Sequence, residues 1–213
     1  MTQFSSNNHS PHFTWRRLLW LAIMLGAMLM YLPINHYQQG GVQLDLALDS
    51  QIPLYPPAII VYLLGSLLFV VFPILVAIFA KPGDFEAFTI AVITAAVISC
   101  VVYLVYPTFV IRPEVTSNDF FSRAIALLYE ADRSYNAAPS GHTFYSLIIC
   151  FFASRWLEKL SWLWWVIATL IIFSTLFTKQ HYVLDLVYGL ILAVLAYDAG
   201  RLIQKRWNLK FAS

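Results

Sequence analysis

The strongest constraint in this sequence is a series of long apolar segments, each close to the length that a helix needs to cross a lipid bilayer. A transmembrane helix needs about 20 predominantly apolar residues, within a range of roughly 17–25. Six segments approach this length: residues 18–34, 58–80, 87–106, 142–156, 161–177 and 181–203. The sequence therefore predicts an all-α, polytopic membrane protein with six transmembrane helices.

The composition excludes several other classes of protein. Hydrophobic residues make up 60% of the chain and charged residues 11%, whereas an average soluble domain is about 25% charged. A disordered chain, a collagen and an ordinary cytosolic enzyme are excluded on this ground. The net charge of +2 provides no basic surface for nucleic acid. Cys100 and Cys150 lie in apolar segments, so neither a disulfide framework nor a four-cysteine metal site is expected.

The chain is expected to form a single domain over residues 1–213, because it has no internal repeat and no long linker. Residues 1–15 are expected to be a disordered tail. The first apolar segment follows Arg16 and Arg17, as in a signal peptide, but it is long for one and lacks a small-residue cleavage site. We therefore expect a retained helix. The sequence does not indicate an oligomeric state.

The basic residues predict the orientation of the six helices. If both termini are cytoplasmic, that side carries most of the basic residues, as the positive-inside rule requires. The predicted cytoplasmic set is Arg16, Arg17, Lys81, Arg155, Lys159, Arg201, Lys205, Arg206 and Lys210, against Arg112, Arg123, Arg133 and Lys179 outside. The small size and short loops favour a bacterial inner membrane. The remaining polar features would then lie on its outer side.

The first polar feature is Arg112, which follows the third apolar segment between Pro107 and Pro113. Prolines end a helix, and a guanidinium at the membrane surface can bind a phosphate through two parallel hydrogen bonds. The alternative is an interfacial arginine that reaches lipid head groups. Arg112 is therefore a candidate phosphate-binding residue.

The second feature is the sequence Pro-Ser-Gly-His at residues 139–142, where the fourth segment begins. Ser140 suits a helix N-cap, and Gly141 lets a ligand approach the backbone. Free N–H groups at a helix N-terminus attract phosphate, and His142 can protonate a leaving oxygen. The alternative is a capped helix start with an interfacial histidine.

The third feature combines Lys179, His181 and Asp185. The last two are four residues apart, so we expect them to share one face of the sixth helix. A carboxylate within a membrane needs a partner, and Asp185 would fix the tautomer of His181 and leave its other nitrogen free to attack. The alternative is a structural His–Asp pair.

The segment between Arg112 and the Pro-Ser-Gly-His sequence, residues 115–136, predicts a short interfacial helix. Asn118 or Asp119 would cap this helix, and surface packing is its simplest role.

Together these features resemble the type-2 phosphatidic acid phosphatase superfamily of integral membrane enzymes. That family carries Lys-x6-Arg-Pro, then Pro-Ser-Gly-His, then Ser-Arg-x5-His-x3-Asp. Arg112 and Pro113 match the end of the first motif, residues 139–142 match the second in full, and Ser174, His181 and Asp185 match the third. The resemblance implies six helices, with all the motifs on one face of the membrane.

Two positions depart from the family pattern, since Val105 and Thr175 stand where the family has lysine and arginine. Lys179 could replace one of these cations. Residues 132–136 and 178–182 are similar to the branch that includes inositol phosphorylceramide synthases, whose members transfer a phosphoryl head group to a lipid alcohol.

The resemblance implies a lipid phosphate as substrate, membrane lipids as surroundings, and neither a metal nor a cofactor. His181 would attack phosphorus to form a phosphohistidine, Asp185 would orient it, and His142 would protonate the leaving alkoxide. The phosphate would be held by Arg112, Lys179 and the backbone at Ser140 and Gly141. Three functions stay open: a phosphatase acting on a phosphatidic acid or prenyl pyrophosphate, a phosphotransferase, and a lipid-phosphate binding protein without catalysis.

Overall fold

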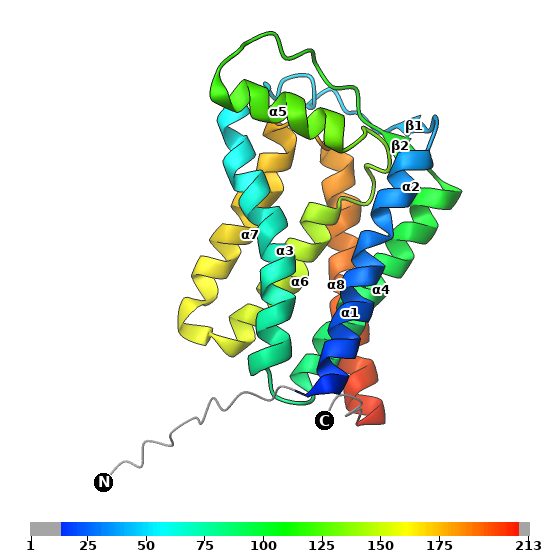
Figure 1. Cartoon of the computed structure of the whole chain (residues 1–213), viewed down its shortest axis with the longest axis vertical. Helices are drawn as coiled ribbons and strands as arrows, with labels where there is room; N and C mark the ends of the chain where they lie inside the picture. Colours follow the sequence, from blue (N-terminus) through cyan, green and yellow to red (C-terminus); the bar gives the residue numbers. More distant parts are fainter. Residues whose placement is uncertain (1–13, 209–213) are drawn as a thin grey trace.

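The structure of the protein, a computed structural model, describes residues 14–208 as a bundle of helices. Its helices are α1 (Trp15–Leu29), α2 (Tyr31–Tyr37), α3 (Ile59–Phe79), α4 (Asp84–Val105), α5 (Phe120–Ala131), α6 (Gly141–Trp156), α7 (Ser161–Phe177) and α8 (Val183–Trp207). The start of α1 and the end of α8 lie at the same end of the bundle, and α5 lies across the opposite end (Figure 1). Toward the end of the bundle where α5 lies, the two-residue strands β1 (Val42–Gln43) and β2 (Thr108–Phe109) pair in parallel.

The all-α membrane fold predicted from the sequence is confirmed, but the number of spans differs. In the described part, five helical segments are long and apolar enough to cross a membrane: Trp15–Tyr37, Pro56–Phe79, Asp84–Val105, Glu158–Phe177 and Val183–Trp207. The fourth predicted span, α6, has 16 residues and is therefore about 24 Å long. The buried, non-helical residues 136–140 precede it. Irregular backbone is tolerated at membrane depth when protein covers it, so α6 need not span the bilayer alone.

The first predicted span is broken into α1 and α2 at Met30. Pro33 explains the break, because proline has no N–H to donate to the carbonyl of Leu29 and its ring crowds that carbonyl. At the other end of α1, Arg17 is buried rather than facing the membrane surface. Its Nη1 donates to the carbonyls of Ala77 and Ala80, at 3.1 and 2.8 Å, and so caps the end of α3. Residues 1–13 of the predicted tail, and Lys210, lie outside the described residues.

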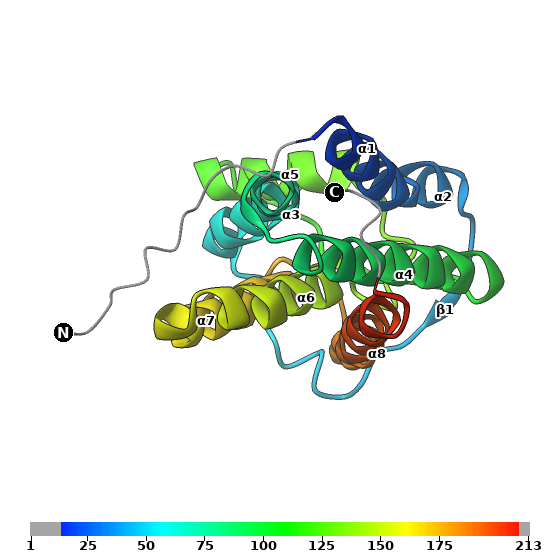
Figure 2. The ribbon, with the colours of Figure 1, turned by 90° about the horizontal axis from the view of Figure 1, so that it is seen from below.

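Small residues allow α8 to approach α4 and α6 closely, and this contact positions the candidate site. A Cβ at Gly200 would lie 2.3 Å from the carbonyl oxygen of Ala87 in α4, and one at Gly189 would lie 2.8 Å from the Cβ of Thr143 in α6. Seen from below, α8 lies beside α4 and α6 (Figure 2). Glycine at such contacts permits close backbone packing in membrane bundles. The N-terminal ends of α6 and α8 are thereby brought together.

The helix predicted between residues 115 and 136 is present as α5. It begins after Asp119, whose Oδ1 accepts the backbone N–H groups of Phe121 and Ser122. Ile125 is fully buried against Ile59 and Tyr62 at the start of α3. This packing fixes α5 across the end of the bundle, next to the candidate site.

Candidate active site

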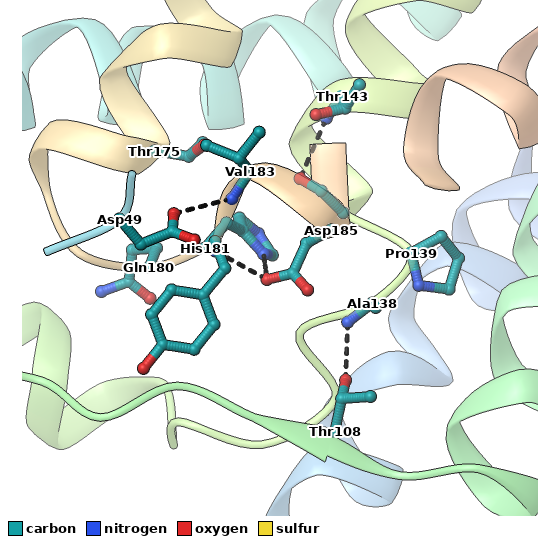
Figure 3. Close-up of polar contacts among 12 residues, drawn as sticks. Asp49, Thr108, Ala138, Pro139, Thr143, Thr175, Gln180, His181, Val183 and Asp185 are labelled. Atoms are coloured by element: carbon teal, nitrogen blue, oxygen red, sulfur yellow. Dashed lines mark hydrogen bonds and ion pairs between the residues drawn. The ribbon is translucent and has the colours of Figure 1, made fainter. Parts of the chain in front are cut away.

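The pair formed by His181 and Asp185 arises from a helix cap and not from a shared helix face. The sequence prediction was wrong here, because α8 begins at Val183 and His181 lies before it. Oδ2 of the fully buried Asp185 accepts the N–H of Tyr182 at 2.8 Å and lies 3.4 Å from Nδ1 of His181 (Figure 3). The cap brings the carboxylate back to the imidazole. Nε2 of His181 is left as the nitrogen available for chemistry.

Two further contacts fix the start of α8. Oδ1 of Asp49 accepts the N–H of Val183 at 2.9 Å, and the N–H of Ser140 donates to the carbonyl of Asp185 at 3.0 Å. The second bond links α8 directly to the N-cap of α6. A loop after β1, α6 and α8 therefore hold His181 jointly, which makes its position rigid.

Lys179 lies away from the other candidate phosphate-binding residues. Its Nζ donates to the carbonyl of Asp49 at 3.0 Å, and burial lowers the pKa of Lys179. The residue adopts a left-handed conformation with φ of 53°, which turns its side chain toward that loop. It does not line the cavity described below. In this geometry Lys179 supports Asp49 and the start of α8, whereas the sequence predicted a contact with phosphate.

His142 lies in the first turn of α6, across from His181. The N-cap Ser140 accepts the N–H of Thr143 through its Oγ at 3.3 Å, as the sequence predicted for this helix start. The ring of His142 stacks on Tyr62, with ring centroids 4.1 Å apart. Its centroid lies 6.4 Å from that of His181, a separation on the order of the space that one phosphoryl group needs between two imidazoles.

Ser66 of α3 contacts one ring nitrogen of His142. The Oγ of Ser66 lies 3.1 Å from Nε2 of His142 and donates its hydrogen to the carbonyl of Tyr62 at 3.2 Å. A hydroxyl has one hydrogen to donate and can also accept, so Ser66 can accept from a protonated Nε2 while it donates to Tyr62. Ser66 is therefore placed to orient Nε2 of His142 when that nitrogen carries a proton.

Arg112 reaches the same place from the loop after β2. Its Nη2 donates to Oε1 of Gln180 at 2.6 Å, its Nη1 donates to the carbonyl of Asp132, and its guanidinium lies 4.8 Å from the ring centroid of Tyr129. The buried Nε of Arg112 has no hydrogen-bond partner among the residues that the structure describes. Arg112 is therefore held in place by protein groups and retains donor capacity for a ligand.

A cavity of about 480 Å³ joins these groups. Its polar end is lined by Arg112, Gly141, His142 and His181, whereas Ser140 and Asp185 are buried behind it. The rest of its wall is largely apolar and comes from α1, α3 and α4. It includes Leu25, Met28, Leu63, Val70 and Ala96. Such a cavity has room for a polar group at one end and a hydrocarbon chain at the other.

A comparison with protein families agrees with this arrangement. A family model described as the PAP2 superfamily matches residues 41–199, which include every element that lines the polar end of the cavity. The chain belongs to the PAP2 superfamily. Its general activity is therefore of the phosphatase or phosphotransferase type, on lipid phosphates. Neither the curated proteins nor the solved structures that were searched include a significant match.

Several residues that line this cavity were not singled out by the sequence motifs. Asp132 lines the cavity, its Oδ1 accepts the hydroxyl of Tyr31 at 2.7 Å, and burial raises the pKa of its carboxyl. Gln180 and Asn136 also line the cavity. The sequence placed all three in stretches similar to one branch of the family, but assigned none of them a role. For Ser66, the available signal was a hydroxyl within an apolar segment, a weak one because serine bonds to its own helix.

The departures from the family pattern lie outside the cavity lining. Val105 ends α4 with 78% of its side chain exposed, and Oγ1 of the buried Thr175 donates to the carbonyl of Ile172. Ser174 likewise donates to the carbonyl of Ile171. Within the described part of the chain, no group of three or more His, Cys, Asp or Glu side chains could hold a metal ion. Among the described residues, the cations that line the cavity with the two histidines are Arg112 and Arg133.

Proposed function

We propose that this protein is a lipid phosphate phosphatase that hydrolyses a phosphatidic acid or a prenyl pyrophosphate through a phosphohistidine. The observation that carries the proposal is the pair of imidazoles across one cavity, His181 and His142, with ring centroids 6.4 Å apart. Asp185 contacts Nδ1 of His181 and leaves Nε2 free. A nucleophile with an orienting carboxylate and a facing general acid is the arrangement that this chemistry needs.

In the first step, Nε2 of His181 attacks phosphorus and the bond from phosphorus to the lipid oxygen breaks. His142 acts here as an imidazolium with both ring nitrogens protonated. It gives its Nε2 proton to the departing alkoxide, which takes the place of Ser66 as acceptor, and becomes a neutral imidazole as the lipid alcohol leaves. Asp185 stabilises the positive charge that develops on the ring of His181. The electron pair of the broken bond thus ends on an oxygen that has been protonated.

In the second step, water attacks the phosphohistidine and the bond between phosphorus and nitrogen breaks. His142 takes the proton of the attacking water, so that inorganic phosphate leaves and both histidines return to their starting states. Arg112 and the backbone N–H groups at Gly141 and His142 bind the phosphate oxygens during both steps, because a helix N-terminus and a guanidinium both attract anions. No metal or cofactor is assigned a role.

The largely apolar wall of the cavity supports a lipid as substrate. Leu25, Met28, Leu63 and Val70 would contact the hydrocarbon chain, which would enter from the bilayer between α1 and α3. Burial of such chains contributes about 0.8 kcal/mol per CH₂ group. In a bacterial inner membrane with both termini in the cytoplasm, the phosphate would be drawn from the outer leaflet.

A phosphotransferase is the second candidate, and a specific observation favours it. The positions of the two family cations are occupied by Val105 and Thr175, and the cavity of about 480 Å³ leaves room for an alcohol in place of water. The first step would be unchanged. In the second, the hydroxyl of a lipid or polyol would attack the phosphohistidine and give up its proton to His142.

The test is the release of inorganic phosphate by the purified protein in detergent with EDTA, from phosphatidic acid and from a prenyl pyrophosphate. A His181→Ala variant is the control, and we expect it to lose turnover completely. Acid-quenched protein should carry a phosphate on His181 in the wild type alone. A phosphohistidine without phosphate release would favour the transferase. Retained activity in His181→Ala would refute the scheme, and binding without a phosphohistidine would indicate a binding protein.

A further inference from the structure

Two buried amide side chains in the cavity wall have hydrogen-bonding atoms without partners. Asn136 is 2% exposed, and neither its Oδ1 nor its Nδ2 has a partner among residues 14–208. Gln180 is 4% exposed, and its Nε2 likewise has none within that range. Both residues line the cavity together with Arg112 and His181. Buried polar atoms of folded proteins nearly always have a partner, either protein or an ordered molecule such as water, so we expect a bound water or ligand atom beside these amides.

We propose that Asn136 and Gln180 bind the phosphate oxygens of the substrate through their amide N–H groups, as neutral donors beside Arg112. This inference rests on the proposed function, since it assigns residues to the same site. It adds two ligand-binding residues that none of the three sequence motifs contains. It also explains how the site could bind phosphate although Val105 and Thr175 occupy the positions of two cations.

The orientation of the Gln180 amide follows from its contact with Arg112. A guanidinium only donates hydrogen bonds, so the amide oxygen must face Nη2 of Arg112, as it does at 2.6 Å. The NH₂ group of Gln180 is then directed away from Arg112. His181 is the next residue in the chain, and both residues line the same cavity.

The backbone conformation of Asn136 explains why asparagine is tolerated at this position, but it does not explain the buried amide. Asn136 has a φ of 57°, a left-handed conformation that asparagine tolerates better than most residues. The left-handed backbone therefore explains why position 136 holds asparagine and not a residue such as leucine. The backbone conformation does not explain why the side chain lies in the cavity wall with both of its polar atoms lacking a described partner, because glycine would adopt this φ more easily.

The charges around the cavity favour neutral donors as well. Arg133 also lines the cavity, but its Nη1 donates to the carbonyl of His36 and its guanidinium lies 5.1 Å from the ring of Tyr135. Asp132 contributes a carboxyl group to the same cavity wall. Since Arg133 is engaged in this way, Arg112 is the cation left for a ligand in this wall, and further N–H donors are needed to surround a tetrahedral phosphate.

The test measures the binding of short-chain phosphatidic acid by calorimetry, in a His181→Ala background where turnover cannot consume the ligand. Asn136→Gly removes the amide and keeps the left-handed backbone. Gln180→Glu keeps the oxygen that faces Arg112 and replaces the donor. Each should weaken binding about 10- to 100-fold, the range of a hydrogen bond to a charged group. Gln51→Ala, in an exposed turn, is the matched control and should bind normally.

Thermal stability separates a binding role from a structural one. Because the amide of Asn136 has no partner in the described structure, Asn136→Gly should melt within a few degrees of its background, while binding falls. Binding within 3-fold of the background in both variants would overturn the inference. So would a background protein that does not bind, or a loss of binding that is matched by a loss of folding.

The proposed function is judged by a different result, the His181-dependent release of phosphate by the wild type. Absence of release together with weakened binding in Asn136→Gly and Gln180→Glu would refute the hydrolysis and support the inference. Release by the wild type together with normal binding in both variants would do the reverse.

Discussion

Replacing Asp185 by asparagine tests the central feature of the site, a carboxylate that contacts the attacking histidine. The substitution conserves shape. An amide oxygen in the place of Oδ2 can still accept the N–H of Tyr182, now bonded at 2.8 Å, so the cap of α8 should survive. What disappears is the negative charge 3.4 Å from Nδ1 of His181.

The size of the expected effect follows from that distance. Coulomb's law with an effective dielectric constant of about 20 gives about 5 kcal/mol for two unit charges 3.4 Å apart. His181 gains a full positive charge only once the bond to phosphorus has formed, so part of this energy acts in the transition state. Each 1.36 kcal/mol corresponds to a factor of about ten in rate. We expect kcat to fall about 10³-fold, with KM changed little.

The assay is steady-state phosphate release from mixed micelles, with melting temperature as the measure of folding. Asp49→Asn is the matched control, because Asp49 also caps α8, through Val183, but is not paired with His181. It should keep kcat within about 5-fold of the wild type. A folded Asp185→Asn protein with kcat within tenfold of the wild type would refute the electrostatic role. Equal losses in the two variants would show that the helix cap alone matters.

Three further predictions concern other parts of the structure. Ser66→Ala should lower kcat about tenfold without changing folding, because His142 loses the acceptor that orients Nε2–H; an unchanged kcat would contradict this. Arg17→Met should destabilise the protein by about 3 kcal/mol through the two lost hydrogen bonds from a charged donor, seen as a melting temperature roughly 6–12 °C lower; equal melting temperatures would show that the cap is dispensable. Burial raises the pKa of Asp132 above its ordinary value of 3.8. The folded protein therefore binds this proton more tightly than the unfolded chain, and stability falls as pH rises from about 4 through the raised pKa. Asp132→Asn should flatten this slope in melting curves between pH 4 and 7, and an equal slope in both proteins would exclude Asp132 as its cause.

The helices were predictable because their signal is local. Apolar length alone located α7 at residues 161–177, the bounds observed, and came within a few residues for α3 and α4. A lipid-facing segment must satisfy its backbone hydrogen bonds within itself, so hydropathy and helix formation coincide there. The bounds of α6 were also predicted to within one residue, but α6 is too short to be among the helices that could cross a membrane. The break before α2, where a single proline interrupts an apolar run, was not predicted.

The motif residues were predictable for a related reason, since each motif lies within a few residues of a helix end. Arg112, His142 and His181 do meet at one cavity, and Ser140 does cap α6. Lys179 shows the limit of such reasoning. Its place in the chain, two residues before His181, gave no information on the direction of its side chain, which a left-handed backbone turns toward Asp49.

By itself, then, the sequence determined the helical membrane fold, the family pattern and the three motifs, because each depends on residues that are close together in the chain. Only the tertiary structure decided that Asp185 reaches His181 through a helix cap, that Ser66 orients His142, and that Asn136 and Gln180 join Arg112 in one wall. Those contacts join segments as much as 76 residues apart. The contacts of Ser66 with His142 and of Gln180 with Arg112 depend on how distant segments pack, which no local pattern encodes, whereas the contact of Asp185 with His181 depends on where α8 begins.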